Sequence, residues 1–279
     1  MRTKFACVVS GIALLTACAT SPEPAAPPPS LEDAVSSHGY VPLALPSSAI
    51  APGAIVRLVH RPDGSSTFER VSSLATCGAT SDETTVTSGE IPALGGKRTF
   101  NLQGSATLAV LQQQIGLTGN QLREFTAKFD SSHDAMLDEF KLDAWRSRIA
   151  GNAAAGLPPI CAQLVSDTPA DLFIVTRGLS FSGGEITARV TTNAGVTVPQ
   201  LFHFLTSLGV TYQQVGESQL TFAGPVYFGV RNIYYAGGKP MVITGGKGLG
   251  ETEIEGGSQI EGSALQALLG GPLSVAPVQ

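Results

Sequence analysis

The sequence predicts an α+β fold in one domain, with a largely antiparallel sheet and a few short helices inserted between its strands. Short apolar runs separated by tight turn signals fill most of the chain, which favours antiparallel neighbours. Few segments have helical periodicity. With 279 residues, 43% of them hydrophobic, the chain is long and apolar enough to bury a sizeable core.

The region His38 to Ser73 alternates short apolar runs with turns. Ala54–His60 (AIVRLVH) is predicted to be a strand, the sequence Arg61-Pro62-Asp63-Gly64 a turn, and Ser66–Ser72 the returning partner strand. The next segment, Gly78 to Lys97, is mostly polar and is predicted to be a loop. We expect a helix from Ser105 to about Ile115, with its leucines on one face.

The segment Leu122–Asp130 fits both helix and strand periods, and we favour a strand because Phe125, Ala127 and Phe129 alternate with polar residues. Ser131 or Ser132 is then predicted to cap a helix that ends near Gly151. That helix would carry Met136, Leu137, Phe140 and Trp145.

The most regular alternation lies between Asp171 and Pro199 and predicts a long amphipathic β-hairpin that turns at Ser182-Gly183-Gly184. This hairpin, Phe173–Val198, has arms of about a dozen residues. An ordinary half-buried sheet gives the same alternation. The residues of its apolar face are Phe173, Val175, Leu179, Phe181, Ile186, Ala188, Val190, Val196 and Val198.

After the hairpin, Pro199 is predicted to open a short helix carrying Leu201, Phe202 and Leu205. Further strands are predicted at Val210–Val215, Gln219–Phe222, Val226–Tyr235 and Met241–Thr244. From Gly245 to Gln279 the chain is Gly-rich and acidic. This tail is either disordered or docks its short apolar element, Leu265–Leu269, on the sheet.

The N-terminus reads as an export signal. Arg2 and Lys4 form a basic start, an apolar stretch follows, and Leu15-Thr16-Ala17-Cys18 resembles the lipobox of bacterial lipoproteins. That resemblance implies a signal peptide of residues 1–17 and a diacylglycerol-modified Cys18 at the start of the mature chain. The alternative is an ordinary signal cleaved near Ala17 or Ala19, with Cys18 incidental.

Acylation of Cys18 would make the lipid bilayer a partner of this chain, because several acyl chains anchor stably. The residue after Cys18 is Ala19 and not aspartate, which resembles the sorting signal of outer-membrane lipoproteins. We therefore expect a lipid-anchored protein of the outer membrane that faces the periplasm. Residues 18–36 contain SPEPAAPPPS and are predicted to be a Pro/Ala-rich tether.

Cys77 and Cys161 are the cysteines that remain inside the mature chain. Exported chains meet an oxidising compartment, so a disulfide between them is the simplest prediction. Two separate buried thiols are the alternative.

No catalytic motif is recognisable. The sequence contains no phosphate-binding loop, no dinucleotide-binding motif, no G-x-S-x-G motif and no zinc-binding motif. We therefore predict that the protein is not an enzyme and binds no cofactor or metal. Asp130, Asp134 and Asp138 are spaced four apart and could hold a cation on a helix, but a solvated face is favoured. A net charge of −5 without clusters of Lys or Arg argues against nucleic acid.

The order of elements resembles the bacterial gasdermins, a family of membrane-pore proteins. The matching stretches are GYVPLALPSSAIAPGAIV (Gly39–Val56), GGKRTFNLQGSATLAVL (Gly95–Leu111), DLFIVTRGLSFSGGEITARV (Asp171–Val190) and LTFAGPVYFGVRNIYYAGGKP (Leu220–Pro240). This resemblance implies a twisted sheet over residues 37–244, held inactive by the tail 245–279. It also implies an activating protease that releases the tail, and a homo-oligomer that inserts amphipathic hairpins into a membrane as a pore. By position, Phe173–Val198 would be one such membrane hairpin, since its arms are longer than the ~9–11 residues that a membrane strand needs. Leu122–Asp130 would supply a strand of the other hairpin.

Overall fold

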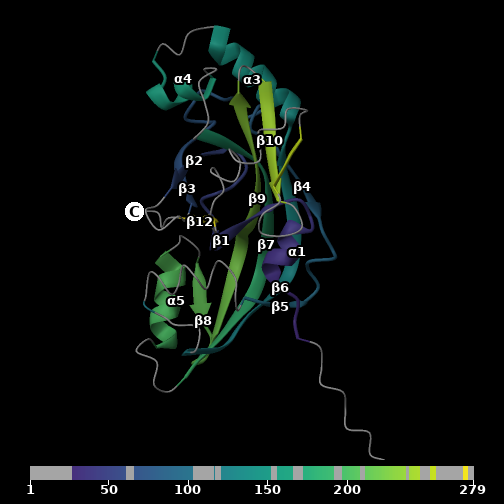
Figure 1. The fold of residues 1–279 in the computed structure, drawn as a ribbon, viewed down its shortest axis with the longest axis vertical. Coiled ribbons are helices and arrows are strands. Elements are labelled where there is room, and N and C mark those ends of the chain that lie inside the picture. Colours follow the sequence, from purple (N-terminus) through teal and green to yellow (C-terminus); the bar gives the residue numbers. More distant parts are fainter. Residues whose placement is uncertain are drawn as a thin grey trace, which may run out of the picture.

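A computed structural model describes residues 27–60, 66–102, 116, 121–151, 156–165, 172–191, 197–207, 211–236, 239–245, 252–255 and 273–275. In these ranges the predicted α+β class is confirmed: short helices flank one large, mainly antiparallel sheet (Figure 1). The export signal, the helix expected at 105–115, the turn at 61–64 and the apolar element 265–269 lie outside the described residues.

Three long antiparallel strands form the centre of the sheet: β6 (Leu122–Leu137), β7 (Leu172–Val190) and β9 (Gln219–Ala236). The middle strand, β7, pairs with β6 on one side and with β9 on the other along most of its length. Its first half is buried on both faces, as expected of a central strand.

The predicted hairpin within this region is wrong, because β7 is one continuous strand through Ser182-Gly183-Gly184. Opposite the two glycines the pairing register with β9 shifts: Ser182 pairs with Pro225 and Gly184 with Phe222, so the extra residue of this bulge lies on β9. Gly184 has a φ of 157°, and a Cβ there would lie 2.5 Å from the backbone oxygen of Lys128 on β6. Glycine is therefore needed at this position because the backbone of β6 approaches so closely, and in sequence the glycine pair resembles a turn signal.

A second correction concerns the segment after Asp130. The predicted strand continues to Leu137, and Ser131 and Ser132 pair with Ser182 and Phe181 of β7 in place of capping a helix. The helix α3 (Glu139–Gly151) begins later and ends where it was expected. Its cap is Asp138, whose Oδ1 accepts hydrogen bonds from the backbone N–H groups of Phe140 (2.9 Å) and Lys141 (3.4 Å).

Further strands extend the sheet in both directions from this centre. Its main path runs β11-β10-β9-β7-β2-β3-β12. The bounds of the added strands are β2 Ala54–His60, β3 Ser66–Ser73, β10 Lys239–Gly245, β11 Thr252–Glu255 and β12 Leu273–Val275. All pairs on this path are antiparallel except β3 with β12, which is parallel.

Four shorter strands lie off this path: β1 (Val41–Ser47) and β8 (Tyr212–Gln214) pair with β9, and β4 (Val86–Glu90) and β5 (Thr99–Asn101) pair with β6. The expected loop Gly78 to Lys97 therefore contains a strand, β4, although all five of its residues are exposed. The backbone of β4 pairs with that of β6. Its side chains are exposed, which explains why the sequence of β4 is polar.

The remaining helices cover the two ends and one side of the sheet (Figure 1). α4 (Pro159–Val165) lies with α3 at one end, and α5 (Val198–Ser207) lies near β8 at the other, as the sequence around Pro199 predicts. α1 (Leu31–Ser36) was expected to be the end of the tether. It is a capped helix, and its buried residues Leu31 and Val35 pack into the core.

The buried side chains form three clusters. The tip core lies among α1, α5, the first halves of β6 and β9 and the second half of β7. The cap core lies between the sheet and α3 and α4. The inner core lies on the opposite face of the sheet from the cap core, beneath β1; its members are Val41, Leu43, Ile50, Ala54, Val56, Leu58, Phe68, Ala135, Phe173, Val175, Tyr227, Val230 and Ile243.

Candidate assembly and membrane sites

The apolar face of the predicted membrane hairpin is part of the protein core. Phe173 and Val175 belong to the inner core, and the next four residues of the set belong to the tip core. Those four are Leu179, Phe181, Ile186 and Ala188. Every one of these six side chains is at most 1% exposed. Lipid contact by this face would therefore require the core to open.

The other three residues of the set are less buried or undescribed. Val190 and Val198 are partly buried and pack against the tip core, Val190 at the end of β7 and Val198 as the first residue of α5. Val196 lies outside the described residues. The structure thus places seven of the nine predicted residues along β7, where six are in the core and Val190 packs against it.

Three elements meet at a polar cluster formed by Tyr40, Asp134 and Arg177. Arg177 of β7 makes a salt bridge with Asp134 of β6. The hydroxyl of Tyr40, just before β1, donates a hydrogen bond of 2.5 Å to Oδ1 of the same carboxylate. Burial and the adjacent carboxylate raise the pKa of Tyr40, and the hydrogen bond to Asp134 raises that of Arg177. The cluster therefore fastens the start of β1 to the central strands.

Close packing beside this cluster fixes α1 on the sheet. A Cβ on Gly229 of β9 would lie 2.5 Å from Cγ1 of Val35 and 2.9 Å from Cβ of Tyr40. Glycine is required there because the α1–β1 connection touches the backbone of β9. No sequence motif marks this contact.

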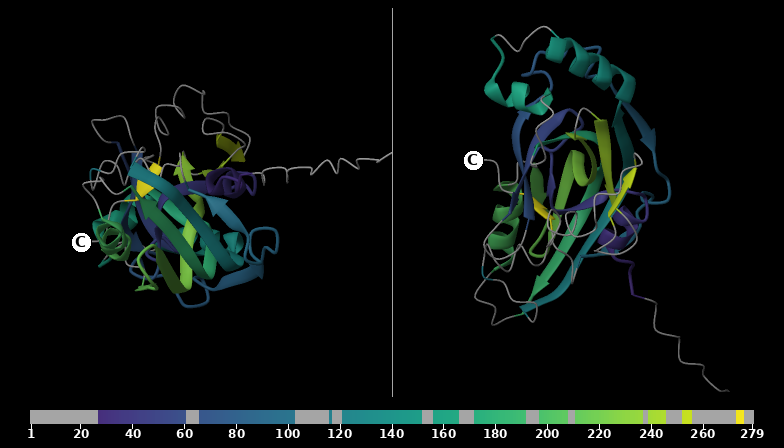
Figure 2. Two further views of the ribbon diagram at one scale, coloured as in Figure 1. Left: turned by 90° about the horizontal axis from the view of Figure 1, so that it is seen from below. Right: turned by 45° about the horizontal axis from the view of Figure 1, so that its top comes forward.

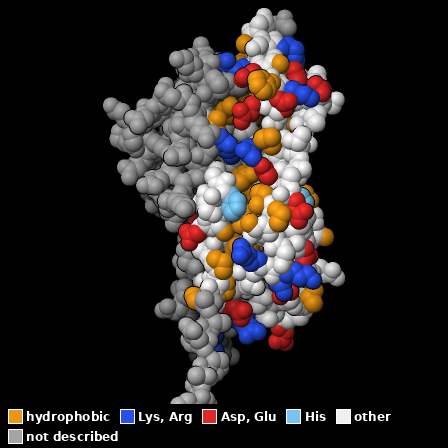
Figure 3. Space-filling view, turned by 90° about the vertical axis from the view of Figure 1, so that its right-hand side faces the viewer, with side chains coloured by type: hydrophobic (Ala, Val, Ile, Leu, Met, Phe, Trp, Pro, Cys, Tyr) orange, Lys and Arg blue, Asp and Glu red, His pale blue; other side chains and the backbone are white. Residues whose placement is uncertain are grey.

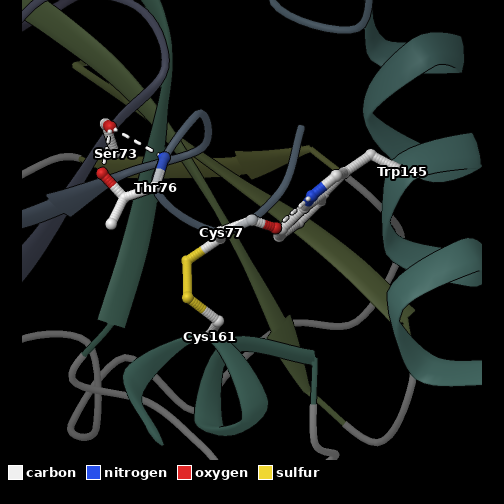
Figure 4. The surroundings of a disulfide bond; sticks show 5 residues. All are labelled: Ser73, Thr76, Cys77, Trp145 and Cys161. Carbon is white, nitrogen blue, oxygen red and sulfur yellow. Dashed lines mark hydrogen bonds between the residues drawn. A yellow bond between two sulfur atoms is a disulfide. The ribbon is translucent and has the colours of Figure 1, made fainter. Parts of the chain in front are cut away.

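A disulfide joins Cys77 to Cys161, as predicted, and both residues are fully buried (Figure 4). It ties the turn after β3 to α4 across 84 residues. The indole N–H of Trp145 on α3 donates to the backbone oxygen of Cys77 at 3.2 Å. Arg148, also on α3, bonds Glu83 and lowers the pKa of that carboxyl. These contacts make α3, α4 and the 74–84 segment one cap over the sheet.

Tail residues supply the outermost strand at both ends of the sheet path. β11 pairs with β10 over four residues, and β12 pairs with β3 over three. β12 also contacts β1, because the sheet curls and brings β1 towards β3 (Figure 2). The sequence left open whether the tail docks on the sheet. The tail strands that pair with the sheet are β11 and β12, whereas the element considered for docking was Leu265–Leu269.

An open pocket of about 700 Å³ lies at the end of the sheet near α5. Its lining includes Arg123, Arg189, Thr197, Gln214 and Glu217. Arg189 is 3.2 Å from Glu124, and Thr197 caps α5 by accepting from the N–H of Gln200 at 3.4 Å. The charged groups of this pocket are therefore mixed in sign and largely exposed.

The three aspartates weighed as a cation site do not lie on one helix. Asp130 and Asp134 belong to β6, Asp134 is held by Arg177, and Asp138 caps α3. Among the described residues, no group of three or more His, Cys, Asp or Glu could hold a metal ion. The same residues contain no helix that is long and apolar enough to span a membrane.

Charges of both signs are interspersed on the face drawn in Figure 3. Lys, Arg, Asp and Glu side chains lie next to one another there, with hydrophobic side chains between them. The described residues of this face form no continuous basic patch of the kind that binds nucleic acid.

The architecture is thus a curled antiparallel sheet whose two path ends are covered by its own C-terminal segment. No protein-family model matches the chain, and no curated protein matches it. Among solved structures, it is similar to the structure of a bacterial gasdermin from Bradyrhizobium tropiciagri, with 15% identity and a TM-score of 0.35. The similar region covers 73% of this chain and 86% of that chain. At this identity and TM-score, the similarity assigns neither a family nor an activity to this chain.

Proposed function

We propose that this chain is an exported, non-enzymatic lipoprotein, anchored through acylated Cys18, whose domain is restrained by its C-terminal tail. Loss of that restraint would let copies of the chain assemble in a membrane and form a pore. The anchor and the outer-membrane location are supported by the lipobox-like sequence before Cys18 and by Ala19 after it.

One observation carries the proposal of restraint: β11 and β12 are the two outermost strands of the main sheet path. Unpaired strand edges invite pairing with another chain, and proteins cover them to prevent it. Removing the tail would uncover β10 at one end and β3 at the other. The tail therefore occupies the positions from which the sheet could grow.

A dye-release assay tests the proposal. The chain from Ala19 onwards, which keeps every described residue, is added to liposomes before and after limited proteolysis of the tail. We expect release only after cleavage, because the restrained sheet has its edges paired and its apolar residues buried. No release in several lipid mixtures, with cleavage verified, would contradict pore formation.

Val190 provides a point substitution for the same assay. Val190→Asp places a charge at the partly buried end of β7, where contact with lipid would be unfavourable. We expect it to abolish release if this strand enters the membrane. Glu90→Gln, on the exposed strand β4, is the control and should leave release unchanged. Full release by the Asp variant would refute the role of β7.

A second candidate is a binding or scaffolding lipoprotein of the outer membrane. The observation that favours it is the complete burial of six predicted membrane-facing residues of β7 in the core. In that case the sheet stays folded and the tail or the sheet surface contacts another envelope protein. A cleaved chain that stays monomeric and ignores liposomes, yet retains one envelope protein in a pull-down, would favour this candidate.

A further inference from the structure

The position of β12 defines a slot in the sheet with a strand on each side. β12 pairs with β3 in parallel, with Leu273 opposite Ser66, Ser274 opposite Thr67 and Val275 opposite Phe68. It also contacts β1, which itself pairs with β9, and the described residues of β1 and β12 form no ladder with each other. A single extended segment therefore fills the space between β1 and β3.

The floor of this slot is the inner core. Phe68 of β3 is 1% exposed and packs edge-on against Phe173 of β7, with ring centroids 5.8 Å apart. Val41 and Leu43 of β1 belong to the same cluster. An empty slot would leave apolar side chains on both sides facing water, so the slot favours an occupied state.

Only a few backbone interactions hold the present occupant. The ladder is three residues long and parallel, a pairing that is slightly less stable per residue than an antiparallel one. The sequence places Pro272 and Pro277 just outside β12, and proline donates no backbone hydrogen bond to extend the ladder. The β12 segment can therefore leave the slot easily, but an empty slot is unfavourable, so another segment should take its place.

We propose that the slot between β1 and β3 is a strand-acceptor site that binds the β12 segment of a second copy of this chain. The segment of a neighbour offers the same backbone donors and acceptors in the same register, so the exchange conserves every pairing that β12 makes. Exchange of an identical element is a low-cost route to oligomers. The inference concerns assembly, and it holds whether or not the assembled chains permeabilise a bilayer.

The proportion of exchanged strands should depend on protein concentration. Within one chain the tail competes at an effective concentration set by the residues that connect β11 to β12. A neighbouring copy competes at its own concentration. Crowding of copies on a vesicle surface therefore shifts the slot towards strands from neighbours.

Paired cysteines at Thr67 and Ser274 test the exchange, because these positions are opposite each other in the ladder. Two chains beginning at Ala19, one with Thr67→Cys and one with Ser274→Cys, are given tags of different size, mixed and treated with a short bis-maleimide. The native Cys77 and Cys161 are buried in a disulfide and do not react with the reagent. We expect a mixed cross-linked dimer whose yield rises with protein concentration.

The matched control mixes Thr67→Cys with Glu253→Cys, a tail position in β11 that pairs with Thr244 at the opposite end of the sheet path. The exchange predicts at least about a tenfold higher yield for the Ser274→Cys pair, since only that pair shares a slot. A chain that carries both Thr67→Cys and Ser274→Cys should cross-link within itself when dilute. Equal yields in the two mixtures would overturn the proposal, as would a doubly substituted chain that fails to cross-link.

Discussion

Asp134 is the residue at which β6, β7 and the segment before β1 are joined. Its carboxylate accepts hydrogen bonds from Arg177 and from the hydroxyl of Tyr40, and all three side chains are at least partly buried. A carboxylate in this setting needs its donors, because a buried charge without partners is costly. The contribution of Tyr40 can be measured separately, since Arg177 would remain paired in its absence.

Tyr40→Phe should lower the free energy of unfolding by about 1.5–3 kcal/mol, the range for hydrogen bonds to charged groups. Urea titration at neutral pH measures the change. Gln213→Ala, at an exposed position on β8, is the control and should change stability by less than about 0.5 kcal/mol. A loss no larger than that of the control would mean that Tyr40 does not support Asp134.

The same substitution makes a prediction about pH. Burial and Asp134 raise the pKa of Tyr40 above its ordinary value of 10.0. Below pH 10 the phenol is protonated in both folded and unfolded chains, so the raised pKa has no effect on stability. Above pH 10 the unfolded phenol ionises first, and stability falls as pH rises. Tyr40→Phe should reduce this alkaline loss; part of it should persist because burial also raises the pKa values of Tyr212 and Tyr227.

The side-chain amide of Asn232 is buried without a hydrogen-bond partner among the described residues. It is fully buried opposite Val175 and Ile243, two members of the inner core, and neither its Nδ2 nor its Oδ1 has a partner. Asn232→Leu should therefore raise the free energy of unfolding by about 1–3 kcal/mol. Urea titration compares it with Gln213→Leu, an exposed control expected to be neutral. Destabilisation by Asn232→Leu would show that the amide is satisfied by a bound water.

The burial of single residues was predictable where alternation was regular. Phe125, Ala127 and Phe129 were assigned to one face of a strand, and all three are buried on β6. The partners of Asp134 were not predictable, because Tyr40 lies 94 positions earlier and Arg177 lies 43 positions later. Spacing within a segment carries no signal for contacts that the sheet topology creates.

At the scale of elements, the disulfide determines how the cap is attached to the sheet. In the chain-entropy model a loop closed over 84 residues is worth roughly 4–5 kcal/mol. The double variant Cys77→Ser, Cys161→Ser should lose about that much stability. Hydrogen exchange should show the loss mainly in α4 and in the turn 74–78, with β6 and β7 remaining protected. Equal deprotection of β6 and β7 would mean that cap and sheet unfold as one unit.

The glycine pair in β7 explains why the predicted hairpin was wrong. Ser-Gly-Gly is typical of a tight turn, and the apolar residues on each side keep the alternation expected of two arms. Glycine is also needed inside a continuous strand where a neighbouring backbone approaches too closely for a Cβ. The neighbour in question is Lys128, more than 50 positions away, so local sequence could not separate the two structures.

The helix expected from Ser131 was wrong for a related reason. Its residues include Met136 and Leu137 at helical spacing, but this stretch pairs with β4 on one side and β7 on the other. Two neighbouring strands outweigh a weak local preference for helix. Short strands with wholly exposed residues, such as β4, have no hydrophobic pattern from which to be predicted.

At the scale of the whole molecule, the tail decides whether the inner core is sealed. A chain that ends after Glu255 lacks β12 but keeps every other strand of the sheet. We expect it to bind the dye ANS several-fold more strongly than the full chain, because apolar side chains between β1 and β3 become accessible. ANS fluorescence and sedimentation velocity measure the exposure and the self-association that follows.

The control for that truncation keeps the length of the chain. Ser274→Pro with Val275→Pro removes two adjacent backbone donors from β12, at least one of which faces β3 in a pleated strand. This variant should match the truncated chain in ANS binding. Unchanged fluorescence in both variants would show that the inner core is closed without β12.

The parallel ladder between β3 and β12 also sets the order in which the chain can complete its fold. Leu273 pairs with Ser66, about 200 residues earlier, and contacts of such long range form slowly. Strands β1 to β10 are all synthesised before β12 is. A newly synthesised chain would therefore assemble almost its whole sheet while the place of the last strand stayed empty. During that interval the edge of β3 would be open to pairing with another segment or another copy of the chain, until β12 occupies it.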